Sequence, residues 1–270
     1  MAVADASTSF WRTFWSSALL APRTTLGFMR LDFVLGTIFI IPLTQMVFFA
    51  FVATLAGNAA SPISYVVIGN AVSTVTYSSV FSVCQTTDSE KNQGTMEHLL
   101  VSPASRLALY FGRGIFPILI SLATVTMGLV YAVTIYHVPF VASGLPYLAV
   151  SVVLTAFAMV GFGLLIGGFA LFLRTSIVIG NIFLFLGLLL SGVNFPLSEL
   201  PPVLQVVGDG LPLTWGISAI RGALAGDGLG VMLVLWGYVG VCALVSFGLA
   251  IGLWGTFERR ALATGAIARF

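Results

Sequence analysis

The sequence predicts an all-α integral membrane protein with six transmembrane helices, an N-terminal interfacial helix and short re-entrant helices before the last span. Three observations predict this fold class. First, 59% of the 270 residues are hydrophobic, 7% are charged and the mean hydropathy is +1.08, which is outside the range of water-soluble domains of this length. Second, six segments are apolar over about the 20 residues that a helix needs to cross the hydrocarbon core. Third, the basic residues segregate to one side of a six-span arrangement.

Residues 1–30 are expected to form a cytoplasmic N-terminus with an interfacial amphipathic helix. Within Ser7–Arg30, Trp11 and Trp15 are interleaved with arginines such as Arg12. Aromatic and arginine side chains at this spacing are typical of a helix that lies in the membrane interface. A signal peptide, the competing interpretation, would place its charges before an apolar core and a cleavage site. Because the long apolar run begins only after this segment, we expect a retained interfacial helix.

The transmembrane domain is expected over residues 31–257, and a cytoplasmic tail over residues 258–270. The predicted spans are Phe33–Leu55, Ile63–Cys84, Leu107–Ile135, Leu145–Leu173, Ser176–Val193 and Leu229–Phe257. The connections between them are mostly rich in Gly, Pro, Asn or charged residues, which are typical of loops. Cys84 and Cys242 fall in or beside apolar segments, so we expect buried thiols rather than a disulfide framework.

The positions of the basic residues give the orientation. Cytoplasmic loops of membrane proteins carry an excess of Lys and Arg. With six spans, ten of the eleven basic residues fall on one side of the membrane, and only Arg221 falls on the other. The segregation is lost if one span is added or removed. We therefore expect a multi-pass protein of the bacterial cell (inner) membrane, with both termini on the cytoplasmic side.

The longest polar interruption is DSEKNQGTMEHLLVSPASR, from Asp88 to Arg106, in a cytoplasmic loop expected over residues 85–107. Thr95 is suited to cap a short helix, Glu97 lies in its first turn, where the helix dipole favours an anion, and Pro103 ends it. A helix of about two turns is unstable alone. We therefore expect this segment to bind a partner surface.

A second informative segment precedes the last span. Residues 194–228 contain four prolines, with one expected short helix near Pro202–Val207 and another that begins at Pro212, where proline suits the first turn. Neither helix is long enough to cross a bilayer. Irregular backbone near the hydrocarbon requires protein or water to satisfy its polar groups. We therefore expect re-entrant helices in the outer leaflet, and an ordinary external loop is the alternative.

Several kinds of chemistry lack the residues that they need. The centres of the apolar segments carry no Asp, Glu, Lys or His, whereas ion-coupled transporters usually place an ionisable residue at mid-membrane. No spacing of carboxylate, Cys and His residues predicts a metal or catalytic site, and the net charge of +2 gives no indication of nucleic-acid binding. The only lysine, Lys91, is followed by Asn92, so the phosphate-binding Gly-Lys-Ser/Thr motif is missing. We expect no catalytic site, no metal and no bound cofactor in this chain.

Small, mildly polar side chains occur in the spans instead. In the second span they fall within about a third of the helix circumference. They are Asn70, Ser73, Thr74, Tyr77 and Gln85. Asn181 is a lone amide in the fifth span. Such residues either line a pathway or form hydrogen bonds to a neighbouring helix, and the residue pattern leaves both interpretations open.

Two G-x-x-x-G spacings also occur, at Gly163 with Gly167 and at Gly248 with Gly252. In a chain with 29 glycines such pairs are expected by chance. We therefore expect close helix packing at these glycines and no more specific role.

Two motifs in this order resemble the type-2 permeases of ATP-binding-cassette (ABC) exporters. GTMEHLLVSP after the second span resembles the family's cytoplasmic coupling segment, where a Gly-Thr-x-Glu-x-Leu-x-x-[Ser/Thr]-Pro pattern is typical. The later SGVNFPLSELPPVLQ, LPLTW and AIRG resemble the stretch between the family's fifth and sixth spans. With the predicted spans and N-terminus, the resemblance covers nearly the whole chain. Within the family, LSGVNFPL and AIRG are most similar to the drug-efflux and nodulation-factor export branch.

The resemblance implies a transport complex. Members of the family work as two permease subunits with two cytosolic ATPases, which bind ATP and Mg²⁺, and the second permease here would be an identical or related chain. The short helix of the polar loop would sit in a groove of the ATPase. The implied coupling residues are Gly94, Thr95, Met96, Glu97, His98, Leu99 and Leu100. Closure of the ATPases on ATP would rock the bundle, which opens it outward.

The resemblance also implies that the second and fifth spans line the substrate path. The candidate path residues are Asn70, Thr74, Tyr77, Phe81, Asn181 and Phe185. An apolar path with few charges suits a small amphipathic compound, a drug or natural product, so efflux and antibiotic resistance are the expected roles. Export of a lipid-linked glycan or a lipid is the alternative, and aromatic rings along the path would favour a glycan as stacking platforms.

Overall fold

The computed structural model describes residues 10–20, 31–55, 62–81, 83, 108, 111–112, 114–170 and 176–264. Within these residues all regular secondary structure is helical. After a helix over residues 10–20, the elements are α2 (Leu31–Leu55), α3 (Ile63–Thr76), the π-helix η1 (Tyr77–Phe81), α7 (Ile115–Thr134), η2 (Ala142–Gly144), α8 (Leu145–Ala170), α9 (Ser176–Leu190), η3 (Leu197–Glu199), α10 (Pro202–Asp209), α11 (Pro212–Ala225) and α12 (Leu229–Thr264). The predicted all-α fold class is confirmed for this part of the chain.

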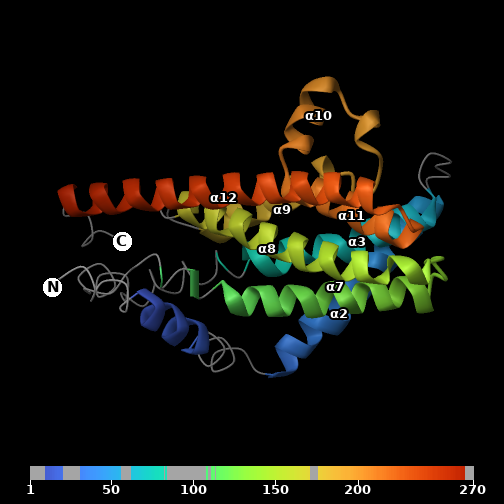
Figure 1. Cartoon of the computed structure of the whole chain (residues 1–270), viewed down its shortest axis with the longest axis horizontal. Helices are drawn as coiled ribbons and strands as arrows, with labels where there is room; N and C mark the ends of the chain where they lie inside the picture. The colour runs from blue at the N-terminus through green and yellow to red at the C-terminus, as the bar shows by residue number, and fades with distance from the viewer. Residues whose placement is uncertain are drawn as a thin grey trace.

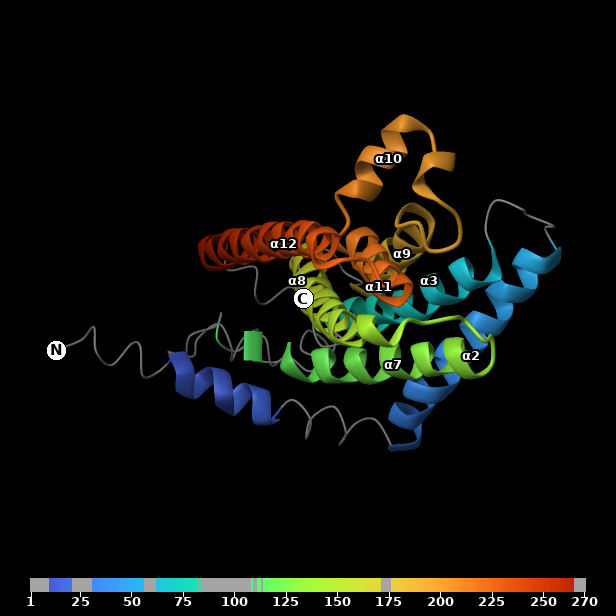
Figure 2. The ribbon, with the colours of Figure 1, turned by 45° about the vertical axis from the view of Figure 1, so that its right-hand side comes forward.

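The long helices run along the longest axis of the molecule (Figure 1). α8 packs against α12 and α11, and α3 packs against α7 and α2. α2 crosses this bundle at an angle, and the segment around α10 projects sideways from it (Figure 2). The helix over residues 10–20 lies at the same end of the bundle as the last turns of α12 (Figure 1).

Among the residues that the structure describes, four helices are long and apolar enough to cross a membrane. Their crossing segments are Val34–Leu55, Ile115–Thr134, Ala142–Gly168 and Leu229–Thr256. α10 and α11 form a pair bent by 79°, which makes a fifth span if it is counted as one, and α9 holds a shorter apolar helix, Val178–Leu190. The first, third, fourth and sixth predicted segments are thus confirmed as span-length apolar helices, and the chain is a multi-pass membrane protein.

The second predicted segment is helical but changes its winding partway. α3 gives way to η1, where the backbone runs close to α8: a Cβ atom on Gly163 would lie 2.9 Å from the carbonyl oxygen of Ser79. The Ser78 hydroxyl donates to the Thr74 carbonyl (3.1 Å), and it shares a hydrogen bond of 2.8 Å with the Ser121 hydroxyl of α7. These side-chain bonds and the close approach accommodate the wider π turn.

The two G-x-x-x-G pairs have different outcomes. Gly163 packs against η1, as predicted. At Gly248 and Gly252 of α12, a Cβ atom would meet nothing within 4 Å, so the predicted close packing is wrong for this pair within the chain. The reason is that this stretch of α12 lies on the outside of the bundle, where Leu244 is 74% exposed.

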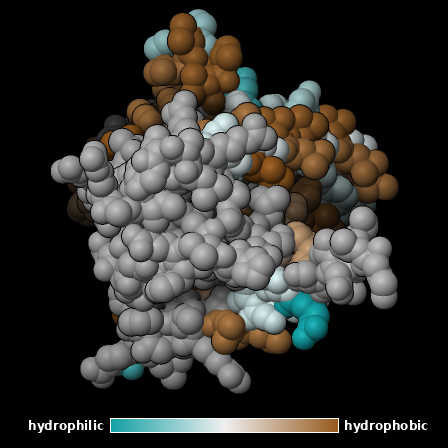
Figure 3. Space-filling view, turned by 90° about the vertical axis from the view of Figure 1, so that its left-hand side faces the viewer, coloured by the Kyte–Doolittle hydropathy of each residue, from teal (hydrophilic) through white to brown (hydrophobic). Residues whose placement is uncertain are grey.

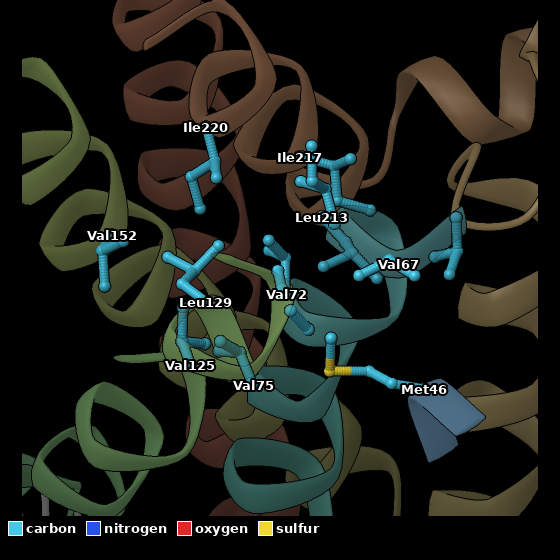
Figure 4. Close-up of a cluster of buried hydrophobic side chains, with 14 of the residues drawn as sticks. Met46, Val67, Val72, Val75, Val125, Leu129, Val152, Leu213, Ile217 and Ile220 are labelled. Atoms are coloured by element: carbon cyan, nitrogen blue, oxygen red, sulfur yellow. The ribbon is translucent and has the colours of Figure 1, made fainter. Parts of the chain in front are cut away.

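α3 is the central helix of the bundle. Its residues from Val66 to Thr76 are all buried. Hydrophobic side chains of α2, α7, α8 and α11 meet α3 in one core, shown in Figure 4 for Met46, Val125, Val152 and Ile217 among others. Polar residues on α3 therefore contact protein rather than lipid in this conformation.

The outer surface of the bundle is hydrophobic. Large apolar side chains are exposed on α2, α9 and α12, such as Phe48, Phe185 and Leu244. Hydrophobic residues also make up much of the coloured surface in the view from the end of the bundle (Figure 3). Such a surface is unfavourable in water but matches the hydrocarbon of a bilayer.

The segment before the last span folds as two short helices, as predicted. α10 and α11 each begin with proline in the first turn. At the bend between them, the Thr214 hydroxyl donates to the Gly208 carbonyl (2.6 Å) and the Trp215 indole N–H to the Asp209 carbonyl (2.8 Å). These bonds satisfy carbonyls at the end of α10, which lets the chain turn sharply without orphaned acceptors.

α12 extends to Thr264, beyond residue 257, where the sequence predicts the end of the transmembrane domain. The added residues, from the sequence ERRALAT, are mostly good helix formers. Because these residues favour helix, α12 continues beyond the end of the apolar segment.

Candidate functional site

The predicted site residues fall into two groups. All coupling residues, Gly94, Thr95, Met96, Glu97, His98, Leu99 and Leu100, lie outside the described residues, so their roles stay predictions. Of the candidate path residues, Asn70, Thr74, Tyr77, Asn181 and Phe185 are described with their side chains, whereas for Phe81 the structure describes only the backbone at the end of η1.

Asn70 is the centre of a hydrogen-bonded network between three parts of the chain. Its side chain is completely buried, and its Nδ2 donates to Asn194 Oδ1 (2.7 Å) after α9 and to the Val66 carbonyl (2.9 Å). Gln45 of α2 donates through Nε2 to Asn70 Oδ1 (3.2 Å) and to the Ser73 hydroxyl (2.9 Å). Asn70 thus joins α2, α3 and the connection that follows α9.

The other candidate path residues are divided between the interior and the surface. Thr74 is 2% exposed and donates to the Ala71 carbonyl (2.7 Å), and Tyr77 is partly buried at the start of η1. Asn181 and Phe185 are one turn apart on the exposed face of α9. In this conformation the structure therefore brings Asn70 and Thr74 together in the core but leaves Asn181 and Phe185 apart from them.

Arg221 is a functional candidate that the sequence reasoning did not identify. Its guanidinium lies over the Tyr65 ring, 3.4 Å from the ring centroid, a geometry that favours cation–π attraction. Nη2 donates to the Tyr65 carbonyl (2.8 Å) and Nη1 to the Gly192 carbonyl (3.1 Å). The available signal was its position as the only basic residue on the predicted outer side, within AIRG.

Arg221 holds α3, α11 and the turn after α9 in close contact. Nη2 also donates to the Val193 carbonyl (3.2 Å). Gly69 of α3 faces this point, and any Cβ there would collide with the Val193 carbonyl oxygen. Gly192 has φ +67, a left-handed conformation that glycine adopts at little cost. The two glycines let the backbones approach closely enough for one guanidinium to bridge them.

The described residues offer no catalytic or metal centre. They contain no group of three or more His, Cys, Asp or Glu side chains that could hold a metal ion. Among them, the buried polar side chains are Ser, Thr and Asn. Such side chains are able to bind and orient a ligand by hydrogen bonds.

Comparisons with known proteins place this architecture in a family. Residues 16–225 match the family described as "ABC-2 type transporter". Over 132 residues the chain is 30% identical to "Probable multidrug ABC transporter permease YbhR" of Escherichia coli strain K12, and equally to the protein of the same name in E. coli O157:H7. The aligned part is 49% of this chain and only 34% of the length of each curated relative.

The family match runs from before α2 to the end of α11, and so includes the Asn70 network and the Arg221 contacts. It agrees with the resemblance seen in the sequence motifs and with a helical bundle that holds several apolar spans. The chain belongs to the ABC-2 type transporter family.

Proposed function

We propose that this chain is the transmembrane permease subunit of an ATP-driven exporter, which moves a small amphipathic compound outward by alternating access. The observation that carries the proposal is the family match over residues 16–225. The multidrug permease named among the relatives supports a drug or natural product as substrate, with efflux and antibiotic resistance as the physiological role.

A separate cytosolic ATPase dimer supplies the energy and binds ATP and Mg²⁺. Within the described residues, no Asp, Glu, Lys or His is among the fully buried polar side chains, and Arg221, which is partly buried, is a cation held by backbone carbonyls. This supports a transporter that is not driven by protons or cations. The ATPase docks on residues 94–100, and Met96, Leu99 and Leu100 give it an apolar contact.

The permease crosses the membrane six times and works with a second permease subunit, identical or related. Four long helices account for four crossings, α3 with η1 for another, and α9 for the sixth, with α10 and α11 as a re-entrant pair in the outer leaflet. The irregular backbone between α9 and α11 is supported by protein contacts, as re-entrant segments require. Both termini then lie on the cytoplasmic side of the inner membrane.

The substrate path runs between α3 and α9. Asn70 and Thr74 lie on its α3 side, and alternating access separates α3 from the α9–α11 segment to expose them. Asn181 and Phe185 enter the path only with the second permease subunit, because they lie on the outward face of α9.

The test is transport by the complex isolated from its native membrane. The tagged permease is purified, a co-purifying ATPase is identified, and both are reconstituted into inside-out vesicles. Two amphipathic dyes of opposite charge are offered, cationic rhodamine 6G and anionic 8-anilinonaphthalene-1-sulfonate. We expect ATP-dependent accumulation of at least one of them, and its loss with vanadate. Accumulation of a labelled lipid-linked oligosaccharide instead supports the glycan alternative, and accumulation that follows a proton gradient without ATP contradicts the proposal.

A further inference from the structure

One contact region of the bundle gathers polar atoms that have no protein partner. We call it the polar seam and define it by Gly69 and Thr76 of α3, Gly187 of α9, Ser191 directly after α9, and Arg221 of α11. At one end, Thr76 Cγ2 lies 3.8 Å from the Cβ position of Gly187, and Ser191 follows one turn later, with its N–H bonded to the Gly187 carbonyl (3.0 Å). At the other end, Arg221 Nη2 lies 2.8 Å from the Cβ position of Gly69.

The unpartnered atoms of the described residues all belong to this seam. Three buried side-chain atoms lack a hydrogen-bond partner there: Thr76 Oγ1, Ser191 Oγ and Arg221 Nε. Thr76 and Ser191 are only 3% and 1% exposed. By contrast, the hydroxyls of Ser73, Thr74 and Ser78 bond to carbonyls of the preceding turn. Buried polar groups without partners are costly to maintain.

The charge of Arg221 is also uncompensated within the described residues. Its Nη atoms bind backbone carbonyls, and none of these residues forms an ion pair with it. Carbonyl dipoles and the Tyr65 ring stabilise the guanidinium but do not neutralise it. A cation held in this way attracts an anionic group that comes within reach.

We propose that the polar seam is the outer part of the substrate path and selects amphipathic compounds that carry an anionic group. This inference rests on the proposed export function. When α3 separates from α9 and α11, the hydroxyls of Thr76 and Ser191 donate to the anionic group, and Arg221 attracts it toward the outer end. Thr76 lies seven residues along α3 from Gly69, the residue that Arg221 approaches, so about 10 Å of helix separates Thr76 from the guanidinium. The proposed donors are thus spread along the direction of export.

Charged thiol reagents test this selection without knowledge of the substrate. In the reconstituted complex, with Cys84→Ala and Cys242→Ala as background, single cysteines are introduced by Ser191→Cys and Thr76→Cys. The matched control is Ser198→Cys, an exposed position on η3 outside the seam, combined with Glu199→Gln to remove the neighbouring carboxylate. Each variant is labelled with anionic sulfonatoethyl methanethiosulfonate and with cationic trimethylammonioethyl methanethiosulfonate, with and without ATP. Each labelling rate is divided by the rate at which the same reagent reacts with free glutathione.

We expect ATP to increase the labelling of Ser191→Cys, with an anionic-to-cationic rate ratio roughly tenfold above that of Ser198→Cys. A single positive charge within about 10 Å produces a ratio of this size when the effective dielectric constant lies between those of protein and water. Adding Arg221→Gln should reduce this ratio to the control value, and Arg221→Lys should retain it. If the Arg221→Gln protein does not assemble, the proposal is decided by comparing Ser191→Cys with Ser198→Cys in the protein that retains Arg221.

The outcomes separate the two proposals. Two outcomes would contradict the proposed role of the polar seam and leave the export function intact. One is an equal anionic-to-cationic rate ratio at Ser191→Cys and Ser198→Cys. The other is the lack of ATP-dependent labelling of the seam in vesicles that do transport dye. Vesicles that show neither ATP-driven transport nor ATP-dependent labelling overturn both.

Discussion

Gly69→Ala should destabilise the protein although alanine is the better helix former. The added methyl group would collide with the Val193 carbonyl oxygen, a backbone atom that Arg221 holds in place. Overpacking of this kind costs about 1–3 kcal/mol, and the upper part of the range applies because no flexible side chain is able to move aside. Alanine is more favourable than glycine in a helix by about 1 kcal/mol, which offsets part of this cost. The net loss is therefore about 2 kcal/mol, which lowers the Tm by roughly 4–8 °C for a chain of this size.

The same substitution at Gly248 is the matched control. Nothing lies within 4 Å of the Cβ position at Gly248, so Gly248→Ala should leave the Tm unchanged or raise it slightly. Both variants are purified in the same detergent and heated to a series of temperatures. The Tm is the temperature at which half of the monodisperse peak in size-exclusion chromatography is lost. Equal Tm values for Gly69→Ala and Gly248→Ala would show that α3 and the turn after α9 are not in close contact, and would refute the reasoning.

Three further predictions concern topology, coupling and the buried network. A cysteine introduced by Ser143→Cys in η2 should react with an impermeant thiol reagent in intact cells, whereas Asn92→Cys should not, and labelling of the latter contradicts the six-span topology. Leu99→Asp should lower the amount of co-purified ATPase at least tenfold, because burial of an unpaired carboxylate costs on the order of 2 kcal/mol or more, while Asn92→Asp should not. Asn70→Ala should lower stability by about 1–3 kcal/mol, since it removes two hydrogen bonds to other segments, from Gln45 of α2 and to Asn194 after α9, each taken as about 0.6–1.7 kcal/mol. A thermal shift smaller than that of Thr44→Ala, whose exposed hydroxyl bonds only within α2, contradicts the last prediction.

The long apolar helices could be predicted from the sequence because one local property, hydrophobic length, determines them. α8 and α12 each exceed the bilayer core without help from their neighbours. Likewise the prolines at 202 and 212 are sufficient to place the starts of α10 and α11, since proline is tolerated in the first turn.

The features that the sequence did not reveal depend on contacts between distant residues. The winding change from α3 to η1 requires Gly163 of α8 and Ser121 of α7 beside it, and neither is near in sequence. Arg221 stood out only as an isolated charge, because its partners are backbone carbonyls, which carry no sequence signal. For Asn70, the pattern predicted a polar face and left its role open. The structure shows hydrogen bonds to Gln45 and Asn194, and a role in transport stays a prediction.

The unequal lengths of α9 and α12 have a consequence for the surrounding lipid. The apolar segment Leu229–Thr256 of α12 has 28 residues, about 42 Å of helix, and so exceeds the roughly 30 Å hydrocarbon thickness, whereas Val178–Leu190 of α9 is only about 20 Å long. In the six-span arrangement proposed above, a single bilayer thickness cannot match both, so the membrane is thinner beside α9 or α12 tilts. Each adjustment costs a fraction of a kcal/mol per Å, and the balance shifts with acyl-chain length. The rate of turnover should therefore depend on whether the host lipid has short or long chains, even when the headgroup is held constant.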